Sequence, residues 1–310
     1  MYTDYDDVGA LAILNAMADA GEAEILAVGS CTWGPGNAAV AAIEIINDWY
    51  GRGDIPVGVS RAGGVKGPGA RGFGLREKHP GAFRYRESDE APDAVTVYRK
   101  ALAAQPDKSV TFCSVGFLNN ARALLESKPD EFSPLSGREL VEKKVRLWVA
   151  MACAWPKGRE CNSAGDPEGS RIAIEGWPTP IVFSDFPYGF SVYTGRAVAE
   201  LDSPGNPVKE VFERMLTPRA RCTDTSWDRL AGHPSWDETA VLAAVRGTGL
   251  YFGTQRGRFR MVGDKGENEW TEDPNGPHQR LVETMPKAEV GKVIDELMCR
   301  PPKHGKKAAK

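Results

Sequence analysis

The chain has 310 residues, of which 41% are hydrophobic and 26% are charged. This is the composition of a globular protein, and it excludes a wholly disordered or fibrous chain. The 39 basic and 42 acidic side chains leave a formal net charge of −3 at pH 7. The mean hydropathy is −0.38, and no apolar run reaches the roughly 20 residues of a membrane helix. We therefore expect neither nucleic acid nor membrane as a partner.

Cysteine usage is the next guide to the class of protein. The six cysteines form no C-x-x-C pair and no dense disulfide framework. Cys31, Cys113 and Cys153 end apolar runs, where a thiol behaves as a small hydrophobic side chain. Reduced core cysteines indicate a cytoplasmic protein. The first residues carry no basic or apolar signal region, but an export signal before Met1 would change this expectation.

Apolar periodicity predicts alternating helices and strands along most of the chain. Helices are expected over Asp6–Ala20, Asn37–Tyr50, Ala94–Ala104, Asn119–Glu126, Pro167–Glu175, Val208–Met215, Asp237–Arg246 and Val290–Cys299. Strands are expected over Glu24–Cys31, Ile55–Val59, Val110–Val115, Val145–Cys153, Ile181–Ser184, Leu250–Phe252 and Phe259–Val262. Residues 61–90 lack a period and are rich in glycine, arginine and proline, which predicts a long loop.

The repeated order of strand, loop and helix predicts an α/β fold, with a mainly parallel open sheet and helices on both faces. We expect a single domain over residues 1–300 and a basic, solvated tail over residues 301–310. In such folds a ligand binds past the carboxyl ends of the strands. The residues that follow each predicted strand are therefore the candidate site.

Three aspartates stand at the start of the first predicted helix: Asp4, Asp6 and Asp7. Acids at a helix N-terminus complement the macrodipole. Carboxylates this close repel one another, however, so the group favours a bound cation or acid–base chemistry. An EF-hand does not fit, because its fifth and twelfth loop positions would be Val8 and Asn15.

Polar groups also follow the later strands. Asn37 ends a glycine-rich turn, where its amide serves a polar ligand or an N-cap. The strand that ends at Val115 runs into Gly-Phe-Leu-Asn-Asn and exposes the Val115 carbonyl at the sheet edge. Glu160 and Asn162 are two residues apart, so they face the same way in an extended stretch. Asp237 opens a late helix with a further carboxylate.

The order of these pieces resembles the inosine–uridine-preferring nucleoside hydrolase family. The segments that carry the resemblance are Asp4-Tyr5-Asp6-Asp7-Val8-Gly9-Ala10-Leu11, Gly36-Asn37, Ser114-Val115-Gly116-Phe117-Leu118-Asn119-Asn120, Gly158-Arg159-Glu160-Cys161-Asn162, Asp166-Pro167-Glu168, Trp177-Pro178-Thr179-Pro180 and Ser235-Trp236-Asp237. Each segment alone is weakly diagnostic, whereas their order and spacing together are specific.

The resemblance implies calcium-dependent hydrolysis of the N-glycosidic bond of ribonucleosides, which releases base and ribose. Carried over residue by residue, the calcium ligands are Asp7, the carbonyl of Val115, and Asp237. The groups for the ribose hydroxyls are Asp6, Asn37, Glu160 and Asn162. Hard oxygen ligands suit calcium, and a metal-bound water made more acidic would attack the anomeric carbon. Family resemblance also suggests a homo-oligomer.

Two features depart from the family pattern. The family motif begins with Asp-x-Asp at the end of a first strand, and by alignment that strand and its catalytic base would precede Met1. Two interpretations follow: the chain lacks its true N-terminus, or it is a divergent relative that binds ribosyl compounds or nucleosides with impaired or absent hydrolysis. Asp4 is the candidate substitute for the base. Trp236 stands where many members have a histidine that protonates the leaving purine. His278 is the candidate acid in its place, while Trp236 could stack on the base.

Overall fold

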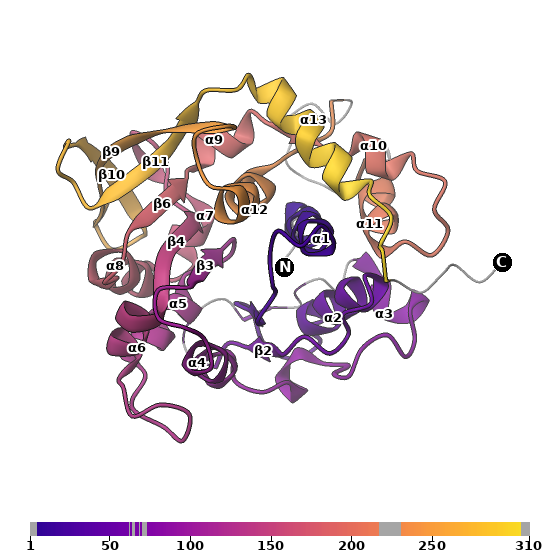
Figure 1. The fold of residues 1–310 in the computed structure, drawn as a ribbon, viewed down its shortest axis with the longest axis horizontal. Coiled ribbons are helices and arrows are strands. Elements are labelled where there is room, and N and C mark those ends of the chain that lie inside the picture. The colour runs from indigo at the N-terminus through magenta and orange to yellow at the C-terminus, as the bar shows by residue number, and fades with distance from the viewer. Residues whose placement is uncertain are drawn as a thin grey trace.

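The computed structural model describes residues 5–61, 63, 66–67, 69, 73–216 and 231–304 (Figure 1). Its helices are α1 (Asp6–Asp19), α2 (Ala39–Trp49), α3 (Leu75–Lys78), the 3₁₀ helix η2 (Ser88–Glu90), α4 (Ala94–Ala103), α5 (Asn119–Glu126), α6 (Gly137–Lys144), α7 (Cys161–Gly165), α8 (Pro167–Gly176), α9 (Phe186–Phe190), α10 (Arg196–Ala199), α11 (Pro207–Leu216), α12 (Trp236–Arg246) and α13 (Lys287–Met298). Its strands are β1 (Val28–Ser30), β2 (Val57–Val59), β3 (Val110–Ser114), β4 (Val145–Met151), β5 (Lys157–Arg159), β6 (Ile181–Ser184), β7 (Tyr193–Thr194), β8 (His233–Pro234), β9 (Phe252–Val262), β10 (Glu267–Glu272) and β11 (His278–Glu283).

A seven-stranded sheet organises the described part of the chain, in the order β3-β4-β6-β11-β9-β10-β5. The first four strands are parallel, and β9, β10 and β5 extend the sheet with antiparallel pairing. β1 and β2 form a separate parallel pair, and β7 pairs antiparallel with β8. With helices packed around this sheet, the predicted α/β architecture is confirmed.

Strand β4 is apolar from Leu147 to Met151, and its place between two cores explains why. Val149 and Met151 face the larger core, which includes residues of α1, α2, α12 and α13. Trp148 and Ala150 face the other core, which includes residues of α5, α6 and α8. Figure 1 shows α12 on one side of the sheet and these three helices on the other. Because successive side chains point to opposite faces, a strand covered on both faces has no polar side.

Several elements differ from the prediction. The expected loop over residues 61–90 contains α3 and η2. Helix α6 was not expected, although Ser136 and Glu139 form a capping box at its start. The two strand pieces predicted after residue 250 are one strand, β9, and its neighbours β10 and β11 were also missed. Five of the six residues of β10 are polar, so its sequence lacks the apolar alternation that marks a strand.

Two of the predictions, the base Asp4 and the basic tail, concern the ends of the chain. Asp4 lies outside the described residues, as do residues 305–310 of the predicted tail. At the start of that tail, the backbone nitrogen of Lys303 donates to Asp19 Oδ2 over 2.9 Å. The predicted boundary between a single domain and its tail stays a prediction.

Two further findings concern the cysteines and the helices of the described residues. The free cysteines are Cys31, Cys113, Cys153, Cys161 and Cys299. Among the same residues, no helix combines the length and the apolar character that crossing a bilayer requires.

Candidate functional site

Asn162 joins the carboxyl ends of two neighbouring parallel strands. Its side-chain amide donates to the carbonyl of Val115 over 3.3 Å and to the carbonyl of Met151 over 3.0 Å. Val115 follows β3 and Met151 ends β4. The structure therefore brings together two residues that sequence reasoning assigned separately, Asn162 to ribose and the Val115 carbonyl to calcium.

Glu160 is buried beside Asn162 and forms the N-cap of α7. Its carboxylate accepts hydrogen bonds from the backbone amides of Asn162 (2.6 Å), Ser163 (2.9 Å) and Cys153 (3.1 Å). Burial raises the pKa of Glu160, and the hydrogen bonds from Asn162, Ser163 and Cys153 oppose this shift. The carboxylate thus holds the turn after β4 in place, and it stands next to the predicted ribose group Asn162.

The first turns of α1 and α12 face each other and gather carboxyl groups. Asp6 and Asp7 begin α1, while Asp237 and Glu238 lie in the first turn of α12. A Cβ atom added at Gly9 of α1 would lie 2.0 Å from Oε1 of Glu238, so the two helices are in direct contact here. Asp6, Asp237 and Glu238 are buried, and Asp7 is half-buried. The structure thus places the predicted metal ligands Asp7 and Asp237 on facing helix starts.

Glu238 is the strongest electrostatic feature of this group. It is fully buried, and neither of its carboxyl oxygens has a hydrogen-bond partner among the described residues. Burial raises its pKa well above the usual value, and the negative charges of Asp6, Asp295 and Asp7 add to the shift. Such an environment favours either a proton on the carboxyl group or a nearby cation.

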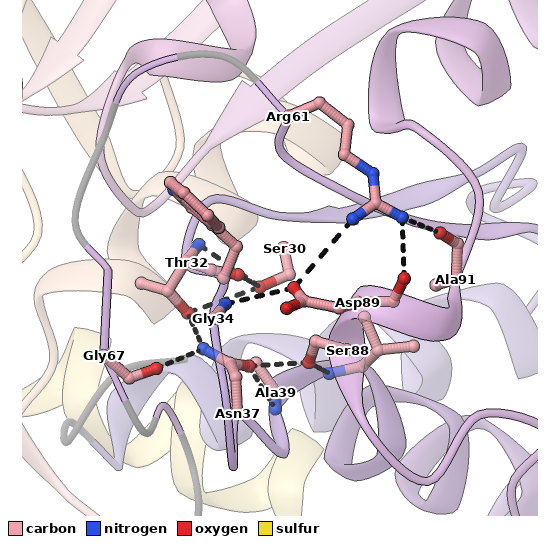
Figure 2. A network of polar contacts seen from close by, with 12 residues as sticks. Ser30, Thr32, Gly34, Asn37, Ala39, Arg61, Gly67, Ser88, Asp89 and Ala91 are labelled. Carbon is pink, nitrogen blue, oxygen red and sulfur yellow. Dashed lines mark hydrogen bonds and ion pairs between the residues drawn. The ribbon is translucent and has the colours of Figure 1, made fainter.

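Figure 2 shows a polar network that fixes the side chain of Asn37. The amide of Asn37 donates to Thr32 Oγ1 over 3.1 Å and to the carbonyl of Gly67 over 2.8 Å. Its Oδ1 accepts from the Ala39 amide over 3.0 Å and from the Ser88 hydroxyl over 2.6 Å. Because Asn37 is fully buried and saturated with partners, its orientation is set before any ligand arrives.

The residues that follow Ser88 also contact the glycine-rich turn that contains Asn37. Asp89 Oδ1 accepts from the backbone amide of Gly34 over 3.0 Å. Arg61 in turn donates to the carbonyls of Asp89 (2.8 Å) and Ala91 (2.6 Å), as Figure 2 shows. Residues of the predicted loop over residues 61–90 therefore hold the Asn37 turn in place through hydrogen bonds.

Two asparagines connect the Asn37 turn to the Val115 turn. Asn119 donates its amide to the carbonyl of Cys31 over 3.0 Å, and Asn120 donates to the carbonyl of Ser30 over 3.0 Å. Both begin α5, which follows β3, whereas Ser30 ends β1. The carboxyl ends of β1 and β3 consequently lie at the same edge of the molecule.

Trp236 lies in an aromatic cluster at the start of α12. Its ring stacks on Phe186 with centroids 5.3 Å apart, and its Nε1 donates to the Phe186 carbonyl over 3.0 Å. The ring of His233 meets Trp236 edge-on at 5.8 Å and Tyr5 at 5.9 Å. Tyr5 directly precedes Asp6, so this cluster adjoins the group of carboxyl groups.

His278 lies at the opposite end of the sheet from the other candidate residues. It begins β11, opposite Ile181 at the start of the parallel strand β6, and thus lies at the amino end of these strands. Its Nδ1 accepts the backbone amide of Phe259 over 3.0 Å. Burial lowers its pKa to about 4. A neutral, buried histidine at this end of the sheet favours a structural role over the predicted acid role.

The donor chemistry at the facing helix starts suits a hard cation, because the nearby groups are carboxylates and a carbonyl. Burial of Glu238 beside Asp6 and Asp7 also leaves an excess of negative charge that a cation would offset. Within the described residues, however, no group of three or more His, Cys, Asp or Glu side chains is arranged to hold a metal. A calcium site therefore stays a prediction.

Comparison with known proteins identifies the family of the chain. A family model described as inosine-uridine preferring nucleoside hydrolase matches residues 3–295. The chain belongs to the inosine-uridine preferring nucleoside hydrolase family, whose members are hydrolases that act on N-glycosyl compounds. No curated protein sequence matches the chain significantly.

Solved structures share the fold over nearly the whole chain. A plant nucleoside hydrolase, PpNRh1, is 20% identical with a TM-score of 0.67, and the match covers 97% of this chain and 98% of that one. An inosine-uridine preferring nucleoside hydrolase from Bacillus anthracis is 16% identical with a TM-score of 0.65, covering 96% of each chain. The type III effector XopQ, complexed with adenosine diphosphate ribose, is 16% identical with a TM-score of 0.66, covering 96% and 91%. At these identities the likeness establishes the fold alone.

Sequence reasoning missed three residues of the site. Ser88 has no local signal, because it lies in a segment without periodicity and contacts Asn37 only through the fold. His233 precedes Asp237 by four residues, and that short spacing could have drawn attention to it. Glu238 directly follows the predicted ligand Asp237, but its burial against Gly9 depends on the packing of two distant helices.

Proposed function

We propose that this protein hydrolyses the N-glycosidic bond of ribonucleosides in a calcium-dependent manner, at the edge where α1, α12, β3 and β4 meet. The observation that carries the proposal is the contact between the first turns of α1 and α12. That contact joins Gly9 to Glu238, which share the first helical turns with Asp6 and Asp7 on one side and Asp237 on the other, although more than 200 residues separate the two helices in the sequence. Family membership supports the same reaction class.

The chain's own groups would orient the substrate. Asp6 and Asn162 would bind ribose hydroxyls, and fixed side chains lower the entropic cost of that step. Asn37 is fully bonded within the protein, so it would bind a hydroxyl only by giving up a partner such as the Gly67 carbonyl. Carboxylates around the sugar ring would stabilise the positive charge that develops on it during cleavage. Calcium, if held by Asp7, the Val115 carbonyl and Asp237, would supply a Lewis acid for ribose and water. Trp236, which is partly exposed, would pack against the base.

A second candidate function is binding of a ribosyl compound without hydrolysis. The predicted acid His278 lies at the far end of the sheet from the other candidate residues. One solved relative with the same fold is a type III effector complexed with adenosine diphosphate ribose. These two observations favour a binding protein if turnover is absent.

The test is base release from inosine, uridine, adenosine and guanosine, measured with calcium and after chelation. We expect calcium-dependent release that falls by at least about 100-fold in Asp7→Asn and in Asp237→Asn. Thermal shift with ribose, each nucleoside and adenosine diphosphate ribose separates the candidates. Binding without base release supports the second function. A folded, calcium-loaded protein that neither releases base nor binds these compounds contradicts both.

A homo-oligomer and a cytoplasmic location stay predictions.

A further inference from the structure

The carboxylate of Glu160 is fully hydrogen-bonded within the protein. Its side chain is buried, and it accepts four hydrogen bonds, from the backbone amides of Asn162 (2.6 Å), Ser163 (2.9 Å) and Cys153 (3.1 Å) and from the Ser163 hydroxyl (3.0 Å). A carboxylate has about four positions for accepted hydrogen bonds. A ribose hydroxyl would therefore bind Glu160 only by displacing one of these partners.

The same carboxylate joins the turn after β4 to the start of α7. Cys153 lies in that turn with φ 71°, in the left-handed region that costs free energy for a residue other than glycine. In this conformation its amide donates to Glu160 Oε2 and to the Ser163 hydroxyl oxygen (3.0 Å). The Asn162 amide donates to the other carboxylate oxygen, Oε1. Glu160 thus fixes both the turn and the backbone that carries the Asn162 side chain.

The side chain of Asn162 has one orientation that satisfies its amide group. Its Nδ2 donates to the carbonyls of Val115 (3.3 Å) and Met151 (3.0 Å), which accounts for both of its hydrogens. The opposite orientation would place Oδ1 against these two acceptors. Oδ1 accepts no hydrogen bond from the described residues, and it is not among their buried oxygens without a partner. Asn162 therefore presents Oδ1 as an accessible acceptor.

Helix α7, which carries Asn162, depends on such support. It has only five residues. A helix this short is not stable on its own, so its order comes from its cap and its surroundings. Glu160 is that cap. Because Asn162 lies at the capped end, the hydrogen bonds of Glu160 determine where the Asn162 side chain starts.

We propose that Glu160 is a positioning residue, which acts through Asn162 and does not contact the ligand, and that Asn162 Oδ1 accepts a hydrogen bond from one ribose hydroxyl. The inference rests on the proposed function, since ribose is the ligand. It also defines what the ligand must supply at this point. Because Oδ1 only accepts, the ligand needs a donor there, and an ether oxygen or a fluorine would face a second acceptor.

The first experiment needs no ligand. The side-chain NH₂ signals of Asn162 are assigned in a heteronuclear NMR spectrum by their loss in Asn162→Ala. We expect their hydrogen exchange to be at least about tenfold slower than that of an exposed asparagine side chain. In Glu160→Gln an NH₂ group replaces one acceptor oxygen and faces only other donors, so this protection should be lost. Unchanged exchange of the Asn162 side chain in Glu160→Gln overturns the proposal.

The second experiment is a double-mutant cycle on the affinity for methyl β-D-ribofuranoside, measured by calorimetry with calcium present. We expect Asn162→Ala and Glu160→Gln each to weaken binding by about tenfold. The double substitution should be at most about twofold weaker than Asn162→Ala alone, because Glu160 acts through Asn162. Losses that multiply to about 100-fold would mean that Glu160 contacts the sugar itself, which overturns the proposal.

Analogues of the riboside test the direction of the hydrogen bond. Each of three analogues carries fluorine in place of one hydroxyl, and each is measured on the parent and on Asn162→Ala. For one analogue, Asn162→Ala should no longer weaken binding, because the donor that Oδ1 needs is already absent. If Asn162→Ala weakens the binding of all three analogues as much as that of the riboside, Oδ1 does not accept a ribose hydroxyl.

A milder variant covers the case in which Glu160→Gln does not fold. Ser163→Ala removes only the hydroxyl that donates to Glu160 Oε2, so the protection of the Asn162 side chain should fall by at least about twofold. Ser170→Ala is the matched control, because Ser170 is also fully buried and its hydroxyl has no hydrogen-bond partner among the described residues. Equal exchange in the two serine variants overturns the proposal.

The two kinds of readout separate this inference from the proposed function. A parent protein that does not bind the riboside contradicts the proposed function. Exchange of the Asn162 side chain then still decides whether Glu160 positions it, since that measurement uses the protein alone.

Discussion

Ser88 donates its hydroxyl hydrogen to Oδ1 of Asn37 over 2.6 Å, from a residue 51 positions later in the chain. The same hydroxyl oxygen accepts the backbone amide of Val40 over 3.1 Å. Ser88 thereby links the glycine-rich turn, the start of α2 and the 61–91 segment (Figure 2). The orientation of a candidate ribose group thus depends on a serine that has no local sequence signature.

The first prediction concerns this serine. Ser88→Ala removes a buried hydrogen-bond partner from Asn37 Oδ1 and another from the Val40 amide. The free energy of unfolding should fall by about 1–3 kcal/mol as a result. We expect weaker binding of ribose or inosine by about tenfold, measured by calorimetry. Ser109→Ala is the control, because Ser109 is exposed and bonds only the Pro106 carbonyl. Unchanged affinity and stability in Ser88→Ala would show that Ser88 does not position Asn37.

The second prediction concerns the contact between α1 and α12. In Gly9→Ala the new Cβ would lie 2.0 Å from Glu238 Oε1 and 3.1 Å from Met298 Sδ, which forces the carboxyl group to move. We expect a loss of about 1–3 kcal/mol in the free energy of unfolding, measured with urea. Gly176→Ala, whose nearest atom would be 3.7 Å away, should change it by less than about 0.5 kcal/mol.

A double substitution separates packing from other effects of Gly9→Ala. In a Glu238→Ala background the clashing carboxyl group is absent, so Gly9→Ala should cost much less there. An equal cost in both backgrounds would mean that the two helices do not meet as described.

The third prediction concerns a buried ion pair at the carboxyl end of β6. Arg280 Nε lies 2.6 Å from Asp185 Oδ2, and Asp185 has no exposed side-chain surface. Arg280→Met would leave a buried carboxylate without its partner and destabilise the fold by about 3–5 kcal/mol, whereas adding Asp185→Asn should recover part of the loss. Urea unfolding measures both.

The control for that pair is Arg196→Met. Arg196 and Glu200 form an ion pair whose side chains are 46% and 65% exposed. Its loss should change stability by less than about 0.5 kcal/mol. A similar effect for Arg280 and Arg196 would contradict the assigned burial.

The fourth prediction is a dependence of stability on pH. Burial raises the pKa of Asp295 from 3.8 to about 6, although the Gly195 amide donates to its carboxylate over 2.7 Å. Glu238 and Cys299 also face Asp295. Between pH 4 and pH 6 the native state holds the proton that the unfolded state has lost, so stability falls as pH rises through this window. The loss is at most about 3 kcal/mol.

The Asp295→Asn variant isolates this contribution. Its stability curve should be flatter than that of the parent between about pH 4 and pH 6, measured as urea midpoints across the range. A parallel curve would show that Asp295 titrates normally.

Local patterns were sufficient for the elements whose apolar residues repeat regularly. Strand β6 and helix α5 have the predicted bounds, and α1 and α12 begin within one residue of them. Strand β10 was missed, because its exposed face carries Glu267 and Glu269 and no apolar alternation marks it. The order of the polar turns also predicted the family, which the match over residues 3–295 confirms.

The sequence alone determined the fold class, the family and most of the candidate residues, since these depend on periodicity and on short motifs along one stretch of chain. Only the tertiary structure decided that Ser88 supports Asn37, that Glu238 lies buried against Gly9, and that Asn162 joins the carboxyl ends of β3 and β4. These are contacts between segments far apart in the chain. No local pattern encodes them, because burial and partner choice follow from how whole helices and strands pack.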